Sequence, residues 1–189
     1  MGEKMKLILA SRSPRRKTLL EELGHEVIVD VSDFDERSIV IPDVKDLVVT
    51  LALKKAEVVA PRHSGSIIVA ADTMVCFEGK EIGQQDSDED ARSVIKLLIG
   101  KTHDVFTGVC IITADGRVLQ DYDKSEVTLK NVSDSVLDEY IKSGKYKGKA
   151  GAYSIRNPEF ELFIEKIEGS ETNIVGLPIE KVKEMLDGI

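Results

Sequence analysis

The sequence predicts an α/β or α+β fold that is built on a mixed sheet. Helical and strand patterns alternate along the first half of the chain, and strand patterns cluster in the middle. No Pro-, Gly- or Ser-rich linker divides the 189 residues. A chain of this length buries roughly 70% of its unfolded surface, so it needs neither a disulfide nor a metal to hold a core. We therefore expect a single domain over residues 1–189.

Capping residues and apolar periodicity define five elements in the first half. Pro14 is at a first helical position behind Ser13, a good N-cap residue, and Gly24 ends that helix. Pro61 ends the next helix. The expected elements are a strand at residues 6–10, a helix at 14–23, a strand at 26–31, a helix at 44–60 and a strand at 66–77.

The second half carries six further elements. Ser87 and Asp90 form a capping box at the start of a helix that Gly100 ends. An Asp-Gly turn at residues 115–116 joins two strand-like runs. The expected elements are a helix at residues 87–99, strands at 105–113 and 118–132, a helix at 136–141, a strand at 160–167 and a helix at 179–186.

Charge and composition argue against several classes of protein. The chain has 34 acidic and 26 basic residues, a net charge of −8, and no Trp, which is a poor composition for binding nucleic acid. Cys76 and Cys110 both lie in apolar runs, as expected in a reducing compartment. No segment is long and apolar enough for a signal peptide core or a membrane span. We expect a cytoplasmic protein without nucleic-acid or membrane partners.

The strongest local signal is the sequence SRSPRRK at residues 11–17. It places three cations in the first turn of a helix, where the helix dipole is already positive. With two hydroxyls and free N–H groups at a strand-to-helix turn, this pattern favours an anion site. The alternative is a solvated basic helix start in which Glu21 offsets Lys17.

Asp72 interrupts a buried apolar run, where an unpaired carboxylate costs several kcal/mol. We expect it at the end of a strand, facing a cleft, where it could bind a divalent cation or act as a general base. The alternative is a turn cap through its neighbour Thr73. Asp33, Asp35 and Glu36 form a solvated loop by default, but beside a phosphate site they could hold magnesium.

Two other basic features are most simply interpreted as solvent-exposed surface. Lys55 belongs to a pair of lysines on a predicted helix, for which a solvated face is expected. Residues 144–151 (GKYKGKAG) form a loop that could reach phosphates, although a plain surface loop is the usual case. Taken alone, the residues indicate an anion-binding helix start accompanied by carboxylates, and they specify no reaction.

Six stretches, in order over nearly the whole chain, carry a specific resemblance. They are residues 9–16 (LASRSPRR), 34–36 (FDE), 51–56 (LALKKA), 71–75 (ADTMV), 149–155 (KAGAYSI) and 175–178 (VGLP). With these motifs the chain resembles the Maf family of nucleotide pyrophosphatases.

This resemblance implies an elongated, mixed and twisted α/β sheet flanked by helices, with two lobes around a central cleft, the Maf/ITPase-like arrangement. It implies hydrolysis of a nucleoside triphosphate to the monophosphate and pyrophosphate, with a divalent cation (Mg or Mn) as cofactor and house-cleaning of unwanted nucleotides as the role. A nucleotide-binding regulator of cell division without turnover is the alternative, and a phosphomonoesterase is a third hypothesis. The oligomeric state stays open, with a homodimer as one option.

Residue matching implies individual roles. Asp72 takes the proton-acceptor position and Glu36 assists it in holding the metal, and whether Asp72 acts as a base or as a metal ligand is left open. The implied substrate-binding residues are Ser11, Ser13, Arg15, Arg16, Lys55, Thr73, Lys149 and Arg156. Of these, Arg15, Thr73 and Arg156 match the positions that tune base choice.

Two departures from the family pattern bear on the substrate. Gln84 and Gln85 replace the usual Lys-Pro, so one phosphate-facing cation is missing, and Arg156 replaces the Gln of the pyrimidine-selective subgroup. A Gln amide both donates and accepts hydrogen bonds, as a uracil or thymine edge requires, whereas Arg only donates. We expect a weaker preference for dTTP and UTP than in that subgroup, with CTP or a guanine nucleotide handled at least as well. The alternative is that Arg156 turns outward to a carboxylate such as Glu159.

Overall fold

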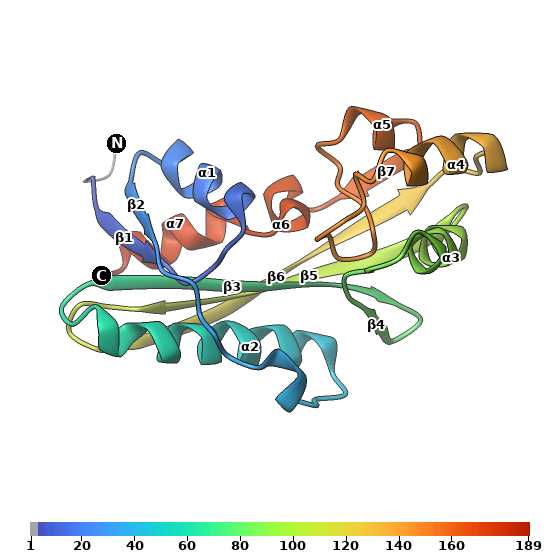
Figure 1. Cartoon of the computed structure of the whole chain (residues 1–189). Coiled ribbons are helices and arrows are strands. Elements are labelled where there is room, and N and C mark those ends of the chain that lie inside the picture. Colours follow the sequence, from blue (N-terminus) through green and yellow to red (C-terminus); the bar gives the residue numbers. More distant parts are fainter. Residues whose placement is uncertain (1–3) are drawn as a thin grey trace.

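The computed structural model describes residues 4–189 and contains a seven-stranded mixed sheet (Figure 1). The strands are β1 (Lys6–Leu9), β2 (Glu26–Val29), β3 (Ile67–Phe77), β4 (Lys80–Ile82), β5 (Thr102–Ile112), β6 (Val118–Leu129) and β7 (Ile164–Glu168). Their order is β2-β1-β3-β5-β6-β7, and β4 pairs with β3. β1 runs parallel to β2 and β3, and the other pairs are antiparallel. The predicted mixed sheet is confirmed.

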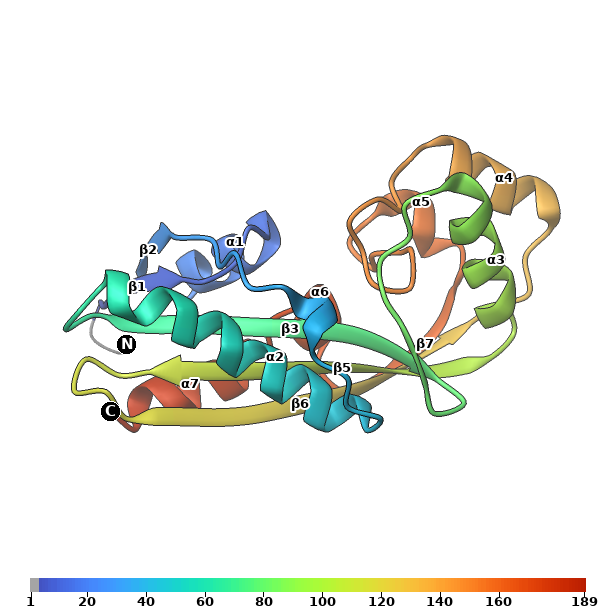
Figure 2. The same ribbon diagram turned by 60° about the horizontal axis from the view of Figure 1, so that its bottom comes forward.

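Helices cover both faces of this sheet and form a second lobe at its far end. They are α1 (Pro14–Glu22), α2 (Val44–Val59), α3 (Asp88–Leu98), α4 (Asp134–Lys142), α5 (Pro158–Glu161), α6 (Glu171–Val175) and α7 (Ile179–Asp187). In Figures 1 and 2, α2 lies along one face, α1 and α7 lie over the other, and α3, α4 and α5 gather at the far end of the long strands. The elongated two-lobed shape is therefore as expected. Within residues 4–189, no helix is both long enough and apolar enough to cross a membrane.

The alternation of side chains along β3 determines which helix each residue meets. Successive residues of a strand point to opposite faces of the sheet. Ile68 and Ala70 pack against α2, whereas Val69 and Ala71 pack against α1 and α7. Asp72 is therefore on the α2 face and Thr73 is on the α1 face.

Gly108 of β5 lies directly against the backbone of α2. A Cβ at this position would lie 2.4 Å from the backbone carbonyl of Val48 and 2.5 Å from the amide nitrogen of Val49. Backbone atoms of a packed helix cannot yield as a flexible side chain can. Gly108 is also the cross-strand partner of Asp72, so the position of α2 and the position of this carboxylate are linked.

We expect Gly108→Ala to lower the free energy of unfolding by about 1–3 kcal/mol or more, because the added methyl group must push α2 away from the sheet. Urea unfolding measures this change. Gly188→Ala is the matched control, because a Cβ there meets other atoms only at 3.6 Å and beyond. Equal stability of the two variants would show that α2 is not seated directly on β5.

The predicted elements agree with the structure to within a few residues except near residue 160. The predicted strand at 160–167 is wrong in its first half, where α5 forms and the strand begins only at Ile164. Phe160 is buried and stacks on Tyr153 and Phe163, with ring centroids 4.7 and 4.6 Å apart. This aromatic packing and Pro158 in the first helical turn favour a helix over the strand that composition alone indicates. β4 and α6, of three and five residues, were not predicted.

Candidate active site

An interruption in the sheet creates the candidate site. β1 pairs with residues 67–69 of β3, and β4 pairs with residues 75–77 on the same edge, so the described strands leave residues 70–74 of that edge without a ladder partner. A cleft of about 890 Å³ opens there. It is lined by the chain that follows β1, by α2 and β3, and by residues 147–150 of the second lobe. Ligand sites of α/β sheets commonly occupy such a crevice beyond strand ends.

The cleft is strongly cationic in an acidic protein. Its lining includes seven cations and three carboxylates, whereas the whole chain has a net charge of −8. The cations are Arg12, Arg15, Arg16, Arg37, Lys55, Lys147 and Lys149, and the carboxylates are Asp33, Glu36 and Asp72. Such a concentration of positive charge attracts an anionic ligand such as a phosphate chain.

The N-terminus of α1 opens into this cleft. Ser13 is the N-cap residue as predicted, but its hydroxyl forms no capping hydrogen bond, and its amide donates to Ser11 Oγ at 3.2 Å. The first turn contains no acidic residue. Amide donors at the end of this helix are thus left for a ligand, which supports the predicted anion site.

Arg15 and Arg16 have different surroundings. Arg16 donates from Nε to Gly176 O at 2.8 Å, from Nη1 to Ser11 Oγ at 3.1 Å and from Nη2 to Thr73 Oγ1 at 3.0 Å. Burial lowers the pKa of Arg16, and the nearby Asp72 carboxylate opposes this shift. Arg15 instead reaches Gly148 O in the second lobe, at 3.5 Å, and burial lowers its pKa also. Arg16 therefore ties α1, β3 and the end of α6 together, whereas Arg15 spans the cleft.

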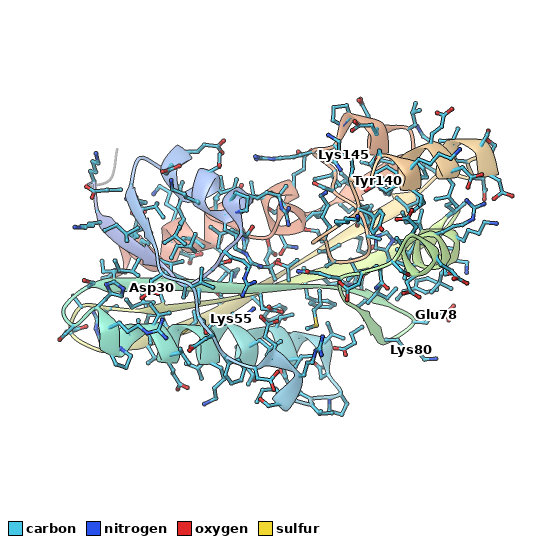
Figure 3. All side chains as sticks on the ribbon, in the orientation of Figure 1. Asp30, Lys55, Glu78, Lys80, Tyr140 and Lys145 are labelled. Carbon is cyan, nitrogen blue, oxygen red and sulfur yellow. The ribbon has the colours of Figure 1, made fainter. Side chains whose placement is uncertain are left out.

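Asp72 and Lys55 form a buried ion pair at the cleft. Lys55 projects from α2 toward the sheet (Figure 3), and its Nζ lies 2.5 Å from Asp72 Oδ1 and 2.9 Å from Glu36 Oε1. Lys55 is 9% exposed and Asp72 is 6% exposed. Two default expectations are therefore wrong. Asp72 lies in the middle of β3 rather than at its end or in a turn, and Lys55 is not on a solvated face.

The second oxygen of Asp72 has no partner of its own within the described part of the chain. Asp72 Oδ2 is buried and has no hydrogen-bond partner among the described residues. Carboxylate oxygens are the ligands that Mg²⁺ prefers, and Mg²⁺ is commonly held by one or two carboxylates together with substrate phosphates. Asp72 and Glu36 provide such a pair, and the described residues contain no group of three or more His, Cys, Asp or Glu side chains that could hold a metal ion by themselves. The residues present thus fit a divalent cation that is shared with a phosphate ligand.

Of the remaining expected residues, Thr73 and Lys149 line the cleft and Arg156 does not. Thr73 Oγ1 lies 2.9 Å from Thr107 Oγ1 and accepts from Arg16, so it helps to orient that guanidinium. Lys149 lines the cleft, and burial together with the neighbouring Arg15 lowers its pKa. The default view of residues 144–151 as a plain surface loop is therefore wrong. Arg156 is exposed and is not among the described residues that line the cleft.

Sequence reasoning assigned no site role to several lining residues, among them Lys147, Arg37 and Tyr153. Lys147 belongs to the basic loop already noted, so its composition was a usable signal. Arg37 and Tyr153 line the cleft as well; Tyr153 lies in the stretch 149–155 that carries the family resemblance, whereas no local pattern marked Arg37. Their positions depend on how distant segments meet.

Tyr153 is braced by a buried histidine. His103 Nε2 lies 2.7 Å from Tyr153 Oη, and the two rings meet edge to face with centroids 5.5 Å apart. Burial lowers the pKa of His103 from 6.5 to about 4. Between these values the unfolded chain binds a proton that the folded protein does not, so folding stability falls as pH drops.

We expect His103→Gln to remove this pH dependence. One pKa unit corresponds to about 1.4 kcal/mol, so the parent should lose about 2 kcal/mol from this group between pH 7 and pH 5. The free energy of unfolding of the parent, relative to that of the variant, should therefore be about 2 kcal/mol lower at pH 5 than at pH 7. Urea unfolding at both pH values measures it, and parallel pH profiles would show that His103 is not held neutral.

The fold and the cleft define an α/β protein with a cationic cleft beside a buried carboxylate–lysine pair. The fold is similar to that of the Ham1 protein of Staphylococcus aureus, with a TM-score of 0.54, 13% identity, and coverage of 97% of this chain and 98% of that chain. Residues 6–189 match the family model described as Maf-like protein, so the chain belongs to the Maf family.

Two curated relatives show how similar this chain is to members with named activities. The dTTP/UTP pyrophosphatase of Pyrococcus horikoshii is 41% identical over 181 residues, which cover 96% of this chain and 95% of the relative. The dTTP/UTP pyrophosphatase of Bacillus cereus is 40% identical over 182 residues, which cover 96% and 89%.

Proposed function

We propose that this protein is a nucleoside triphosphate pyrophosphatase that hydrolyses dTTP and UTP to the monophosphate and pyrophosphate. The observation that carries the proposal is the buried Asp72, which has one unpartnered oxygen beside a cleft lined by seven cations. Membership of the Maf family and the names of the relatives support the same reaction. The whole chain would act as one catalytic domain over residues 1–189.

The phosphate chain would bind along the cationic side of the cleft. Amides at the start of α1 and the hydroxyls of Ser11 and Ser13 donate to phosphate oxygens. Arg15, Arg16 and Lys149 neutralise the charge that develops on the leaving pyrophosphate. Phosphoryl transfer depends mainly on such positioning and charge stabilisation, so no covalent intermediate is required.

Asp72 would orient the attacking water or accept its proton at the unpartnered Oδ2. Its other oxygen stays fixed by Lys55, so the carboxylate presents a defined direction to the cleft. Asp72 and Glu36 are the residues that would hold Mg²⁺ or Mn²⁺ together with phosphate oxygens. When bound, such a cation supplies charge neutralisation to the phosphate chain.

The proposed base preference replaces the one that Arg156 led us to expect. That expectation required the Arg156 side chain to reach the base, but this side chain lies outside the lining of the cleft, and Glu159 contacts Lys145 instead. Arg15 and Thr73, the other two positions that the family resemblance implies in base choice, both line the cleft, and the two relatives are named dTTP/UTP pyrophosphatases. We therefore favour dTTP and UTP, with house-cleaning of nucleotides in the cytoplasm as the role. The free thiols of Cys76 and Cys110 suit that compartment.

A substrate panel tests the proposal directly. The protein is incubated with Mg²⁺ and dTTP, UTP, CTP or dGTP, and the products are resolved by ion-exchange chromatography. We expect dTTP and UTP to be converted fastest, each to its monophosphate and pyrophosphate. Binding without turnover would support the regulator hypothesis, and release of orthophosphate would support the phosphatase hypothesis. A faster reaction with CTP or dGTP would restore a role for Arg156 in base choice.

A further inference from the structure

One ammonium group bridges the two carboxylates that fit a metal ion. Lys55 Nζ lies 2.5 Å from Asp72 Oδ1 and 2.9 Å from Glu36 Oε1, so it occupies the position of a cation that both carboxylates share. The contact between Lys55 and Asp72 is fixed by the two elements that carry these residues. Lys55 is on the buried face of α2 with Ala52, Ala56 and Val59, and Asp72 points to that face from β3.

The net negative charge around the two carboxylates is small for a site that binds a free divalent cation. The two carboxylates and Lys55 together carry one net negative charge, and the Arg16 guanidinium is close enough to interact electrostatically with both Asp72 and Glu36. Mg²⁺ loses its hydration shell reluctantly and needs strong anionic ligands to replace it. A divalent cation that approaches alone therefore meets two fixed cations and little net negative charge.

A nucleoside triphosphate changes this balance. Its phosphate chain brings several negative charges into the same cleft, and Lys55 can share its ammonium with a phosphate oxygen. We propose that Lys55 keeps Asp72 and Glu36 from binding a divalent cation on their own, so that the metal enters only together with the nucleotide. This inference rests on the proposed function, because it concerns the metal that the reaction uses.

The test measures Mn²⁺ binding without nucleotide, by the electron paramagnetic resonance signal of the free ion. The parent protein should bind Mn²⁺ weakly. Lys55→Met keeps the length of the side chain and removes its charge, and it should tighten Mn²⁺ binding by at least about tenfold. Lys54→Met is the matched control, because the half-buried Lys54 pairs with Glu57 at 2.8 Å, away from the carboxylate pair. It should bind Mn²⁺ as the parent does.

Two further measurements keep the inference falsifiable if Lys55→Met does not fold, which circular dichroism will show. Lys55→Arg retains the charge and should bind Mn²⁺ as weakly as the parent. When a dTTP analogue with a methylene group between the α- and β-phosphorus atoms is added, the parent should bind more Mn²⁺ than the same concentration of analogue binds without protein. Tight Mn²⁺ binding by the parent alone, or a folded Lys55→Met protein with unchanged affinity, would overturn the inference. Neither outcome depends on turnover, so the proposed reaction is tested separately.

Discussion

Asp72→Asn should reduce turnover of dTTP by about 10²–10⁴-fold, the range that general base catalysis contributes. Asn keeps the shape of the side chain but loses its charge and basicity. Because Glu36 remains at 2.9 Å from Lys55 Nζ, the ammonium keeps one anionic partner and the fold should survive. Initial rates at saturating nucleotide measure the effect, and a thermal unfolding curve verifies the fold.

Asp33→Asn is the matched control for this variant. Asp33 also lines the cleft, but its side chain is exposed and pairs with Arg62 at 3.1 Å. Removing its charge should leave turnover within a few-fold of the parent. If Asp72→Asn retained activity in the same range as Asp33→Asn, Asp72 would have no part in the chemical step.

Arg16→Ala should weaken triphosphate binding more than monophosphate binding. A charge-assisted contact contributes about 1.5–3 kcal/mol, so the triphosphate affinity should fall roughly 10- to 150-fold. The reason is that Arg16 lies at the start of α1, where the phosphate chain would bind, and its guanidinium is fixed by three acceptors. Calorimetric titration with dTMP and with a non-hydrolysable dTTP analogue compares the two ligands.

The adjacent Lys17 supplies the control for Arg16. Lys17 is on the same helix but does not line the cleft, and it pairs with Glu21 at 3.3 Å as the sequence indicates. Lys17→Ala should therefore change neither affinity. Equal losses for dTMP and the dTTP analogue in Arg16→Ala would mean that Arg16 only braces Ser11, Thr73 and Gly176 and does not contact the pyrophosphate.

Most of the secondary structure could be predicted because capping and terminating residues mark the ends of the helices. Pro14 and Gly24 bound α1, and the Ser87 hydroxyl accepts from the Asp90 amide at 3.0 Å at the start of α3, as the capping box predicts. The failure at residue 160 has a tertiary cause, since Phe160 packs on Tyr140 and Tyr153, which belong to other segments of the chain. Local propensity cannot register such contacts.

The candidate site was predictable in part. The anion-binding start of α1 and the unusual Asp72 were both visible in the sequence. The burial of Lys55 also had a signal, because it is three and four residues from Ala52, Leu51 and Val59, all on the apolar face of α2. By contrast, Arg15 meets Gly148, 133 residues further along the chain, and no local pattern indicates that contact.

The central claim is that water attacks the α-phosphorus of the nucleotide beside Asp72, and hydrolysis of dTTP in ¹⁸O-labelled water tests it most directly. Mass spectrometry of the two products locates the incorporated oxygen. The account predicts that the label appears in dTMP and not in pyrophosphate, and that Asp72→Asn slows its appearance by the factor given above. Label in pyrophosphate would place the attack on the β-phosphorus and would contradict the assignment of this cleft.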